Sequence, residues 1–440
     1  MRRSLQMLTA LSAAICSASL LSTVSAAGEE LCSLAPESYA SARSTNPKLA
    51  TAISELEKHS IATWYSDRNG DYAATLSQLV KKCSADTRLS IVVYGLPNKD
   101  CEAGYSAGGG TVKNAADYLT FIKGLTSAVG NRKTLYVLEP DAVGLLAKEN
   151  GCGATNGYSD NLKVAIKELS ANPNAEIYLD IGYWTLEYPD STTRVTTVVK
   201  ELAKAGTIKG ITINTSNYRS NKQLATLCTN FQQSMGSGST YTCIVDTSRN
   251  YNEPASTEWC NVRPAGIGHP PTSETGFANL DYFMWVKVPG ESDGTCNDGS
   301  HNADAMKGPD AGKFFEEAFT LLWNQGYFVK EGGLSAIGGG SVAPTPASTT
   351  PAPATTTPKT PTPPSSTSPS VKPTSPPATV RPYEPSPAPA TKTPGATTAA
   401  PTKKPTPTKG LSPAPTAKPS SAPMPKPTKA CRVRGARARK

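Results

Sequence analysis

The chain has 440 residues and 38 prolines, and 26 of these prolines lie between residues 341 and 430. This stretch is otherwise rich in Thr, Ser, Ala and Lys and has too little apolar surface to offset its ordering entropy, so we expect a disordered tail at 341–440 and one folded domain at 27–340. The tail carries a net charge of +14 and residues 28–340 carry −7, which argues against nucleic-acid binding by the folded part.

Residues 1–26 predict a secretory signal peptide. Arg2 and Arg3 precede an apolar run over residues 8–21, and Val24-Ser25-Ala26 has the small-x-small form that signal peptidase cleaves. No later run is long enough to span a bilayer, and the basic C-terminus lacks the apolar tail of a lipid-anchor signal. We therefore expect a secreted, extracellular protein without a membrane anchor.

The cysteine count agrees with export. Cys16 lies in the signal peptide, Cys431 lies in the tail, and eight cysteines remain between Cys32 and Cys296, which predicts four disulfides. Zinc is the alternative, but no C-x-x-C pair occurs. The three histidines, which lie outside ligand spacing from any cysteine pair, are His59, His269 and His301. We expect no metal and no other cofactor.

Short β-type runs alternate with amphipathic stretches along the folded part. The expected strands are residues 61–65, 90–94, 134–138, 176–179, 210–213, 242–245 and 283–286. The expected helices include residues 113–125, 160–169, 192–203, 223–233 and 311–323. Strict alternation predicts a parallel sheet, and seven strands favour a closed or nearly closed α/β barrel, with an open doubly wound sheet as the alternative. No G-x-G-x-x-G follows the first strand, so nothing supports a dinucleotide site.

Polar side chains gather where the expected strands end. They are Tyr94, Asp100, Glu139, Asp141, Asp180, Asn214, Asp246, Lys287, Glu291 and Asp293. In an α/β barrel the carboxyl ends of the strands build the active site, although Asp and Asn there could also simply cap the next helix. Two carboxyls close together cannot both ionise readily, and glycosidic hydrolysis uses one protonated and one ionised carboxyl. Asp100 and Asp141 are the obvious pair. Magnesium held by these carboxylates is the alternative, but no phosphate-binding Gly loop is present.

Aromatic residues near the strands suit a carbohydrate ligand, because flat rings stack on sugar rings. Trp64, Trp184 and Trp259 border polar turns and are candidates for the binding surface. Trp285 lies within an apolar strand, and we assign it to the core.

Seven strings in this order resemble the motifs of glycoside hydrolase family 6. They are VYGLPNKDC (93–101), LEPD (138–141), YLDIG (178–182), NTSNY (214–218), DTSRN (246–250), WCNV (259–262) and WVKVPGESDG (285–294). The resemblance covers about residues 45–335. It implies a distorted seven-stranded parallel β/α barrel and a secreted enzyme that cuts β-1,4-glucan with inversion.

The resemblance also implies roles for single residues. Asp141 matches the general acid, Asp100 the aspartate that raises the pKa of that acid and helps to place the water, and Asp293 the proposed base, acting through a water chain. Tyr94 matches the tyrosine that distorts the sugar at the cleavage point, and Ser106 resembles the mobile-loop serine that holds the water. The candidate substrate-binding residues are Trp64, Asp180, Trp184, Asn214, Trp259, Lys287 and Glu291, of which Asp180 matches a structural and substrate-orienting aspartate.

Some positions depart from the family. Lys99 stands where the family usually has Arg, and Tyr183 and Leu186 stand where it commonly has His and Trp, which affects plus-side sugar binding rather than the chemistry. The resemblance further implies the disulfides Cys101–Cys152 and Cys260–Cys296, which leaves Cys32 with Cys83 and Cys228 with Cys243.

We expect a monomeric, endo-acting glucanase. Endo action is expected because two long loops roof the active site in exo-acting members of the family, and both are short here. The first covers residues 101–109, and the second follows Asp293 and ends where the expected helix at Ala311 begins. A processive cellobiohydrolase is the alternative within the family. A catalytically weak glucan-binding cell-wall protein is the alternative of another class. The basic tail, which we expect to be O-glycosylated, could bind anionic cell-wall polymers.

Overall fold

All strands of the sheet run parallel, as the alternating pattern predicts. The computed structural model describes residues 29–68, 71–253 and 256–339, so the predicted signal peptide and basic tail lie outside the described residues. The strands are β1 (Leu31–Cys32), β2 (Thr63–Ser66), β3 (Arg88–Tyr94), β4 (Thr134–Leu138), β5 (Ala175–Asp180), β6 (Gly210–Ile213), β7 (Thr242–Asp246) and β8 (Leu280–Met284).

Helices follow most strands, and several begin at a polar cap. The helices are α1 (Glu37–Thr45), α2 (Ala50–Leu56), α3 (Tyr72–Lys82), α4 (Ala115–Val129), α5 (Ala142–Ala147), α6 (Cys152–Thr155), α7 (Tyr158–Leu169), α8 (Pro189–Leu202), α9 (Asn221–Met235), α10 (Glu316–Asn324) and α11 (Tyr327–Lys330), with short 3-10 turns η1 (Pro47–Leu49), η2 (Tyr183–Leu186) and η3 (Ala203–Ala205). The side chains of Asp71, Asn114 and Ser220 accept hydrogen bonds from the first turns of α3, α4 and α9. None of the described helices is long and apolar enough to cross a membrane.

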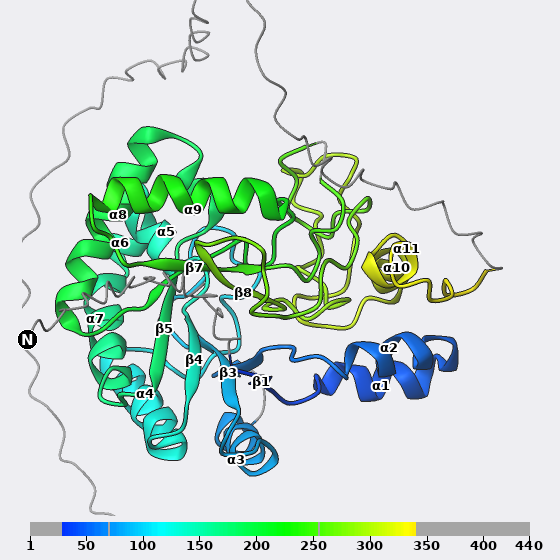
Figure 1. Ribbon diagram of the computed structural model, residues 1–440, viewed down its shortest axis with the longest axis horizontal. Coiled ribbons are helices and arrows are strands. Elements are labelled where there is room, and N and C mark those ends of the chain that lie inside the picture. The colour runs from blue at the N-terminus through cyan, green and yellow to red at the C-terminus, as the bar shows by residue number, and fades with distance from the viewer. Residues whose placement is uncertain (1–28, 69–70, 254–255, 340–440) are drawn as a thin grey trace, which may run out of the picture. The chain divides into compact units, whose positions relative to one another are not determined.

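The sheet order is β1-β3-β4-β5-β6-β7-β8, and β2 also pairs with β3 (Figure 1). β1 pairs with the start of β3 and β2 with its end. The sheet curls until Ile61, just before β2, bridges Trp285, just after β8. The predicted distorted seven-stranded parallel β/α barrel is therefore confirmed as β2 to β8, preceded by the two-residue β1.

Most predicted boundaries differ from the structure by a few residues, and two of these differences concern the segments on either side of Asp293. The last strand was expected at 283–286 but spans Leu280–Met284, because Trp285 leaves the ladder to bridge Ile61. The helix expected from Ala311 begins at Glu316, so that part of the prediction was wrong. Residues 312–315 instead pair with the segment before Asp293: Gly312 N donates to Ser292 O at 2.9 Å and Phe315 N to Gly290 O at 2.8 Å. The loop after Asp293 is consequently longer than expected.

The barrel interior is filled by every second residue of each strand. Trp64, Val92, Val137 and Tyr178 lie in register across four strands, and the last three belong to one buried cluster with Ile244. Two residues beyond Val92 of β3, Tyr178 of β5 and Ile244 of β7, the same face of the sheet carries polar side chains. They are Tyr94, Asp180 and Asp246. The alternation that buries the core thus places a polar layer at the carboxyl ends.

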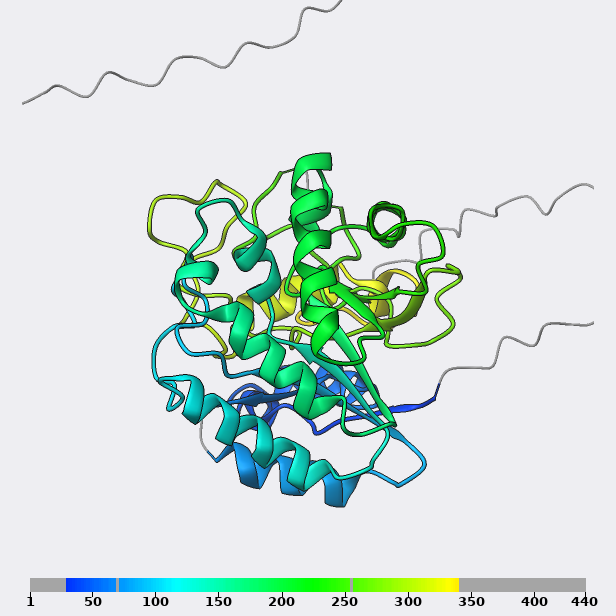
Figure 2. The ribbon, with the colours of Figure 1, turned by 90° about the vertical axis from the view of Figure 1, so that its left-hand side faces the viewer.

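Two further clusters surround the barrel. The largest packs α3, α4, α7, α8 and α9 on the outer face of the sheet, and Figure 2 shows these helices following one another in chain order. The other joins α1 and α2 to α10 and α11, beside the seam closed by Ile61 and Trp285 (Figure 1). Trp285 is fully buried, as expected for a core residue.

Candidate active site

A cleft of about 1750 Å³ opens where the strands end. This is larger than the roughly 300–1,000 Å³ of sites for one small ligand, so it has room for a chain of several units. Ten of the twelve predicted catalytic and substrate-binding residues line it: Trp64, Tyr94, Asp100, Ser106, Asp141, Trp184, Trp259, Lys287, Glu291 and Asp293.

The remaining two predicted residues, Asp180 and Asn214, are not among the residues that line the cleft. Both are fully buried: Asp180 is the last residue of β5, and Asn214 directly follows β6. Asp180 Oδ1 accepts a hydrogen bond from Asp141 N at 2.9 Å, and Asn214 Nδ2 donates to Asp246 O at 2.8 Å. These contacts link the segments that form the floor of the cleft.

Asp141 follows β4 with a φ of 67°, in the left-handed region. This conformation turns its backbone N–H toward Asp180 and opens its side chain to the cleft. Partial enclosure by protein, together with the negative charges of Asp180, Asp100 and Glu102, raises its pKa to about 8. A carboxyl group in this state can donate a proton at neutral pH.

Asp100 lies on the loop after β3, also with a positive φ, of 53°. Its Oδ2 accepts a hydrogen bond from Ser106 N at 2.5 Å, and its backbone O accepts from Gly104 N at 2.9 Å. Burial raises the pKa of Asp100, although the N–H groups of Ser106 and Gly104 oppose the shift. The loop thus folds around the carboxylate.

Asp293 is buried among cationic side chains. It pairs with Arg249 at 2.6 Å and with Lys287 at 3.0 Å, and Asn261 N donates to it at 2.9 Å. Burial alone would raise its pKa, but the charges of Arg249 and Lys287 outweigh burial and lower the pKa to about 2. Between about pH 2 and pH 8, Asp293 is therefore ionised while Asp141 is protonated.

Two buried carboxylates organise the loops around this site. Glu139 accepts from Gly95 N at 2.9 Å, Leu96 N at 3.2 Å and Tyr118 OH at 2.9 Å, which ties the end of β4 to the loop after β3. Asp246 accepts hydrogen bonds from four backbone N–H groups, those of Ser216, Ser248, Val286 and Lys287. Burial raises the pKa of Glu139 to about 7, against the effect of its N–H donors.

The three predicted tryptophans line the cleft, together with tyrosines and Phe314. Trp64 lies edge-on to Tyr94, with ring centres 5.4 Å apart. Trp184 fits because residue 144 is Gly: a Cβ there would lie 2.6 Å from the indole. Trp259 is 37% exposed, so its ring is free to contact a ligand.

Lys99 and Tyr183, two of the residues that depart from the family pattern, each contact a neighbouring charged side chain. Lys99 forms a buried ion pair with Asp67 at 2.5 Å and lies over the Tyr94 ring, 5.5 Å from its centre. The ring of Tyr183 is covered by the Arg219 guanidinium, 4.4 Å from its centre. Lys99 thus steadies Tyr94 and the loop of Asp100, while Tyr183 is largely buried.

Several site residues were not predicted from the sequence. Arg249 and Asn261 lie within quoted motifs, so the same strings could have indicated them. Ser38 of α1 donates to Glu291 Oε1 at 2.7 Å, across 253 positions of sequence. No local pattern marks such a contact.

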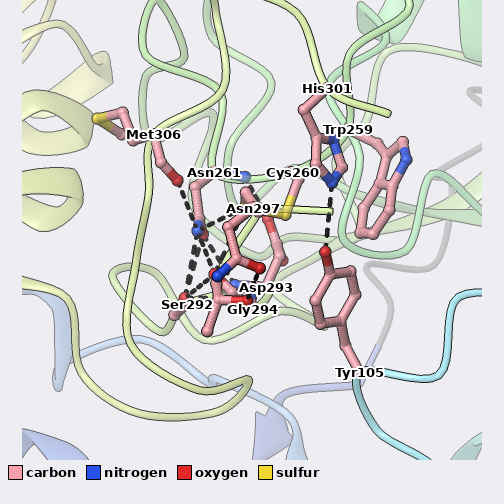
Figure 3. Close-up of a disulfide and its surroundings, with 12 residues drawn as sticks. Tyr105, Trp259, Cys260, Asn261, Ser292, Asp293, Gly294, Asn297, His301 and Met306 are labelled. Atoms are coloured by element: carbon pink, nitrogen blue, oxygen red, sulfur yellow. Dashed lines mark hydrogen bonds between the residues drawn. A yellow bond between two sulfur atoms is a disulfide. The ribbon is translucent and has the colours of Figure 1, made fainter. Parts of the chain in front are cut away.

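All four predicted disulfides are present: Cys101–Cys152 and Cys260–Cys296, which the family resemblance implied, and the remaining pairs Cys32–Cys83 and Cys228–Cys243. Figure 3 shows Cys260 between Trp259 and Asn261, beside Asp293. Among the described residues, one group places three potential metal ligands close together: Cys260, Cys296 and His301. The disulfide occupies both of its sulfur atoms, so this group offers no thiolate ligand.

Opening Cys101–Cys152 is expected to lower activity before it unfolds the barrel. This disulfide anchors the loop that carries Asp100, and both cysteines are partly exposed. We expect the double Ser variant of this pair to lose most of its hydrolytic activity at a temperature where circular dichroism still shows folded protein.

The Cys32–Cys83 pair is the matched control, because it spans the same 51 positions but joins β1 to the end of α3 rather than anchoring the loop of Asp100. Its double Ser variant should lose comparable unfolding free energy, since the two closed loops are of equal length. Equal activity loss in both variants would contradict a specific role for the Cys101 loop.

Known proteins resemble this chain in sequence and in fold. Residues 27–325 match the family model "Glycosyl hydrolases family 6". A probable 1,4-beta-D-glucan cellobiohydrolase C of Aspergillus niger is 30% identical over 298 residues, covering 59% of this chain and 64% of that protein. Endoglucanase A of Cellulomonas fimi is 34% identical over 230 residues, covering 52% and 45%. The chain thus spans roughly half to two thirds of the length of these relatives.

Solved structures of similar fold include a GH6 enzyme of Orpinomyces, with a TM-score of 0.59 and 25% identity over 68% of this chain and 97% of that one. Cellobiohydrolase II of Humicola insolens, in complex with glucose and cellotetraose, has a TM-score of 0.58 and 25% identity, covering 68% and 98%.

Proposed function

The chain belongs to glycosyl hydrolase family 6, and on this premise we propose that it hydrolyses β-1,4-glucan chains with inversion, using Asp141 as the general acid. The observation that supports this proposal is the state of Asp141, which opens to a long cleft and has a pKa raised to about 8. It gives its proton to the glycosidic oxygen as the bond from that oxygen to the anomeric carbon breaks. The relatives named above, a cellobiohydrolase and an endoglucanase, support a cellulose-type substrate.

A water molecule attacks the anomeric carbon in this proposal. We assign its placement to Asp100 and Ser106, which one hydrogen bond joins. The water loses its proton through further water to Asp293, which is ionised because of its low pKa. A carboxylate with such a pKa is a weak base, so we propose that it passes the proton on to solvent rather than storing it.

The sugar contacts follow from the cleft lining. We propose that Tyr94 crowds the sugar at the cleavage point, that Trp64 and Trp259 stack sugars on one side of it, and that Trp184 does so on the other. Lys287 and Glu291 supply polar contacts on the side of Trp64. The four disulfides are typical of oxidising compartments and support a secreted protein.

Inversion predicts that the first product is the α-anomer. Direct attack by water places the new hydroxyl on the face opposite the leaving group, with acid and base carboxyls roughly 6.5–9.5 Å apart in such enzymes. Proton NMR during the first minutes of cellohexaose hydrolysis would measure the anomer. A β-anomer appearing first would contradict the proposal.

We propose endo action, because the loop over residues 101–109, one of the two that roof exo-acting members of the family, is short. One observation favours the processive alternative: Tyr105 OH donates to Asp298 Oδ2 at 2.8 Å, so the two loops beside the site touch. The loop after Asp293 is also longer than expected. Endo action therefore requires that this contact opens to admit a chain.

Viscosity of carboxymethyl cellulose distinguishes the two modes. Endo action predicts a rapid fall in viscosity for little sugar released, and Tyr105→Phe, which removes the hydroxyl donor, should leave the ratio nearly unchanged. A slow fall in the native protein, accelerated by Tyr105→Phe, would instead support the processive cellobiohydrolase.

A further inference from the structure

Asn261 is a buried residue that no step above uses, although it touches Asp293 twice (Figure 3). Its backbone N donates to Asp293 Oδ2 at 2.9 Å, and its side-chain Oδ1 accepts from Asp293 N at 2.8 Å. Its Nδ2 donates to Gly294 O at 2.9 Å and to Met306 O at 3.2 Å. The side chain therefore uses both its acceptor and its donors on the loop of Asp293.

The backbone at Asn261 makes this double contact possible. Its φ is 46°, in the left-handed region that Asn tolerates better than most residues. The turn directs the N–H and the side chain toward the same segment. The adjacent disulfide Cys260–Cys296 joins the same two segments by a covalent bond. The Trp259 segment and the Asp293 segment are thus joined both by the hydrogen bonds of Asn261 and by this disulfide.

The two oxygens of Asp293 have different partners. Oδ2 accepts three hydrogen bonds, from Arg249 Nη1 at 2.6 Å, Asn261 N at 2.9 Å and Tyr218 OH at 3.3 Å. Oδ1 contacts Lys287 Nζ at 3.0 Å. A carboxylate oxygen has about two lone-pair sites, so Oδ2 is saturated while Oδ1 retains room for another donor. Because Asp293 lines the cleft, Oδ1 is the oxygen left for water.

We propose that Asn261 is a positioning residue that fixes the orientation of the Asp293 carboxylate, so that Oδ2 stays within the protein network and Oδ1 faces the reacting water. Arg249 and Lys287 contact only the carboxylate of Asp293, whereas Asn261 binds its main chain through the side chain and its carboxylate through the backbone N–H. This inference rests on the proposed function, because it assumes that Asp293 receives the proton of the water.

Asn261→Gly tests the proposal, because Gly adopts the positive φ without strain and removes only the side chain. Without it the main chain of Asp293 loses its acceptor. A misplacement of about 1 Å can cost on the order of 10²-fold in rate. We expect kcat on cellohexaose to fall about ten- to hundredfold, with KM within about twofold. The fall should be as large on a cello-oligosaccharide with an activated leaving group, because Asp141 is untouched.

Asn252→Gly is the matched control. Asn252 Nδ2 donates to Pro264 O at 2.8 Å in the same region but has no hydrogen bond to Asp293. It should lower the melting temperature with little change in kcat. An unchanged kcat for Asn261→Gly, or a loss confined to KM, would overturn the proposal. A native protein that releases no reducing sugar from glucan would instead overturn the proposed function itself.

If Asn261→Gly does not fold, Asn261→Asp takes its place. It keeps the shape, the tolerance of positive φ and the Oδ1 acceptor, but it loses the Nδ2 donor and adds a charge beside Asp293. We expect a folded protein with nearly unchanged KM, a lower kcat and an acid limb of its pH profile displaced upward, because the new charge raises the pKa of Asp293. A native kcat and pH profile would overturn the proposal.

Discussion

Replacing Asp141 with Asn is expected to lower kcat on cellohexaose by about two to four orders of magnitude, the range that general acid assistance contributes. The amide keeps the size of the side chain and its place in the cleft, but it cannot give a proton to the glycosidic oxygen. KM should change little, because the aromatic walls and polar contacts that hold the sugars remain. Steady-state release of reducing sugar, measured beside a thermal melt, gives both quantities.

The leaving group separates acid catalysis from other effects of this substitution. A sugar whose leaving group departs as a stable anion needs no proton, so Asp141→Asn should lose much less rate on such a substrate than on cellohexaose. Asp160→Asn, at an exposed position of α7, is the control and should leave both rates unchanged. Equal losses on the two substrates would remove Asp141 from the role of acid.

The sequence predicted the barrel because each strand carries its own local signal. Residues 134–138 and 210–213 coincide with β4 and β6, because short apolar runs with β-branched residues between helical segments favour buried strands. The position of the carboxylates could also be predicted, because the carboxyl ends of parallel strands meet at one edge of the sheet. Asp100, Asp141 and Asp293 could therefore be assigned to one cleft from spacing and motif.

Long-range partners could not be predicted in this way. The burial of Asp180 and Asn214 depends on partners from neighbouring segments: Thr215, 35 positions from Asp180, donates to its carboxylate, and Asp246, 32 positions from Asn214, accepts from its amide. The contact of Tyr105 with Asp298 spans 193 positions between two irregular loops. The start of α10 at Glu316 depends on Gly312 and Phe315 pairing with the Asp293 loop, a choice that the helical pattern does not reveal.

Activity is also expected to disappear at alkaline pH. The acid must be protonated, and the pKa of Asp141 is raised to about 8, so kcat/KM should hold through neutral pH and then fall about tenfold per pH unit above pH 8. Asp293, with a pKa lowered to about 2, stays ionised over this whole range and does not contribute to the alkaline limb. The pH dependence of kcat/KM on cellohexaose between pH 5 and 10 measures this alkaline fall and gives the pKa of the acid in the free enzyme.

Asp180→Asn should move this alkaline limb to lower pH. Among the neighbouring carboxylates, Asp180 is the strongest electrostatic cause of the raised pKa of Asp141, and removing its charge makes ionisation of Asp141 easier. The amide oxygen can still accept from Asp141 N, so the left-handed turn that presents the acid is kept. Glu102→Gln is the milder comparison, because Glu102 is exposed, paired with Lys148 and screened by solvent, and its removal should shift the limb less. An alkaline limb that stays in place in Asp180→Asn would mean that a group other than Asp141 controls it.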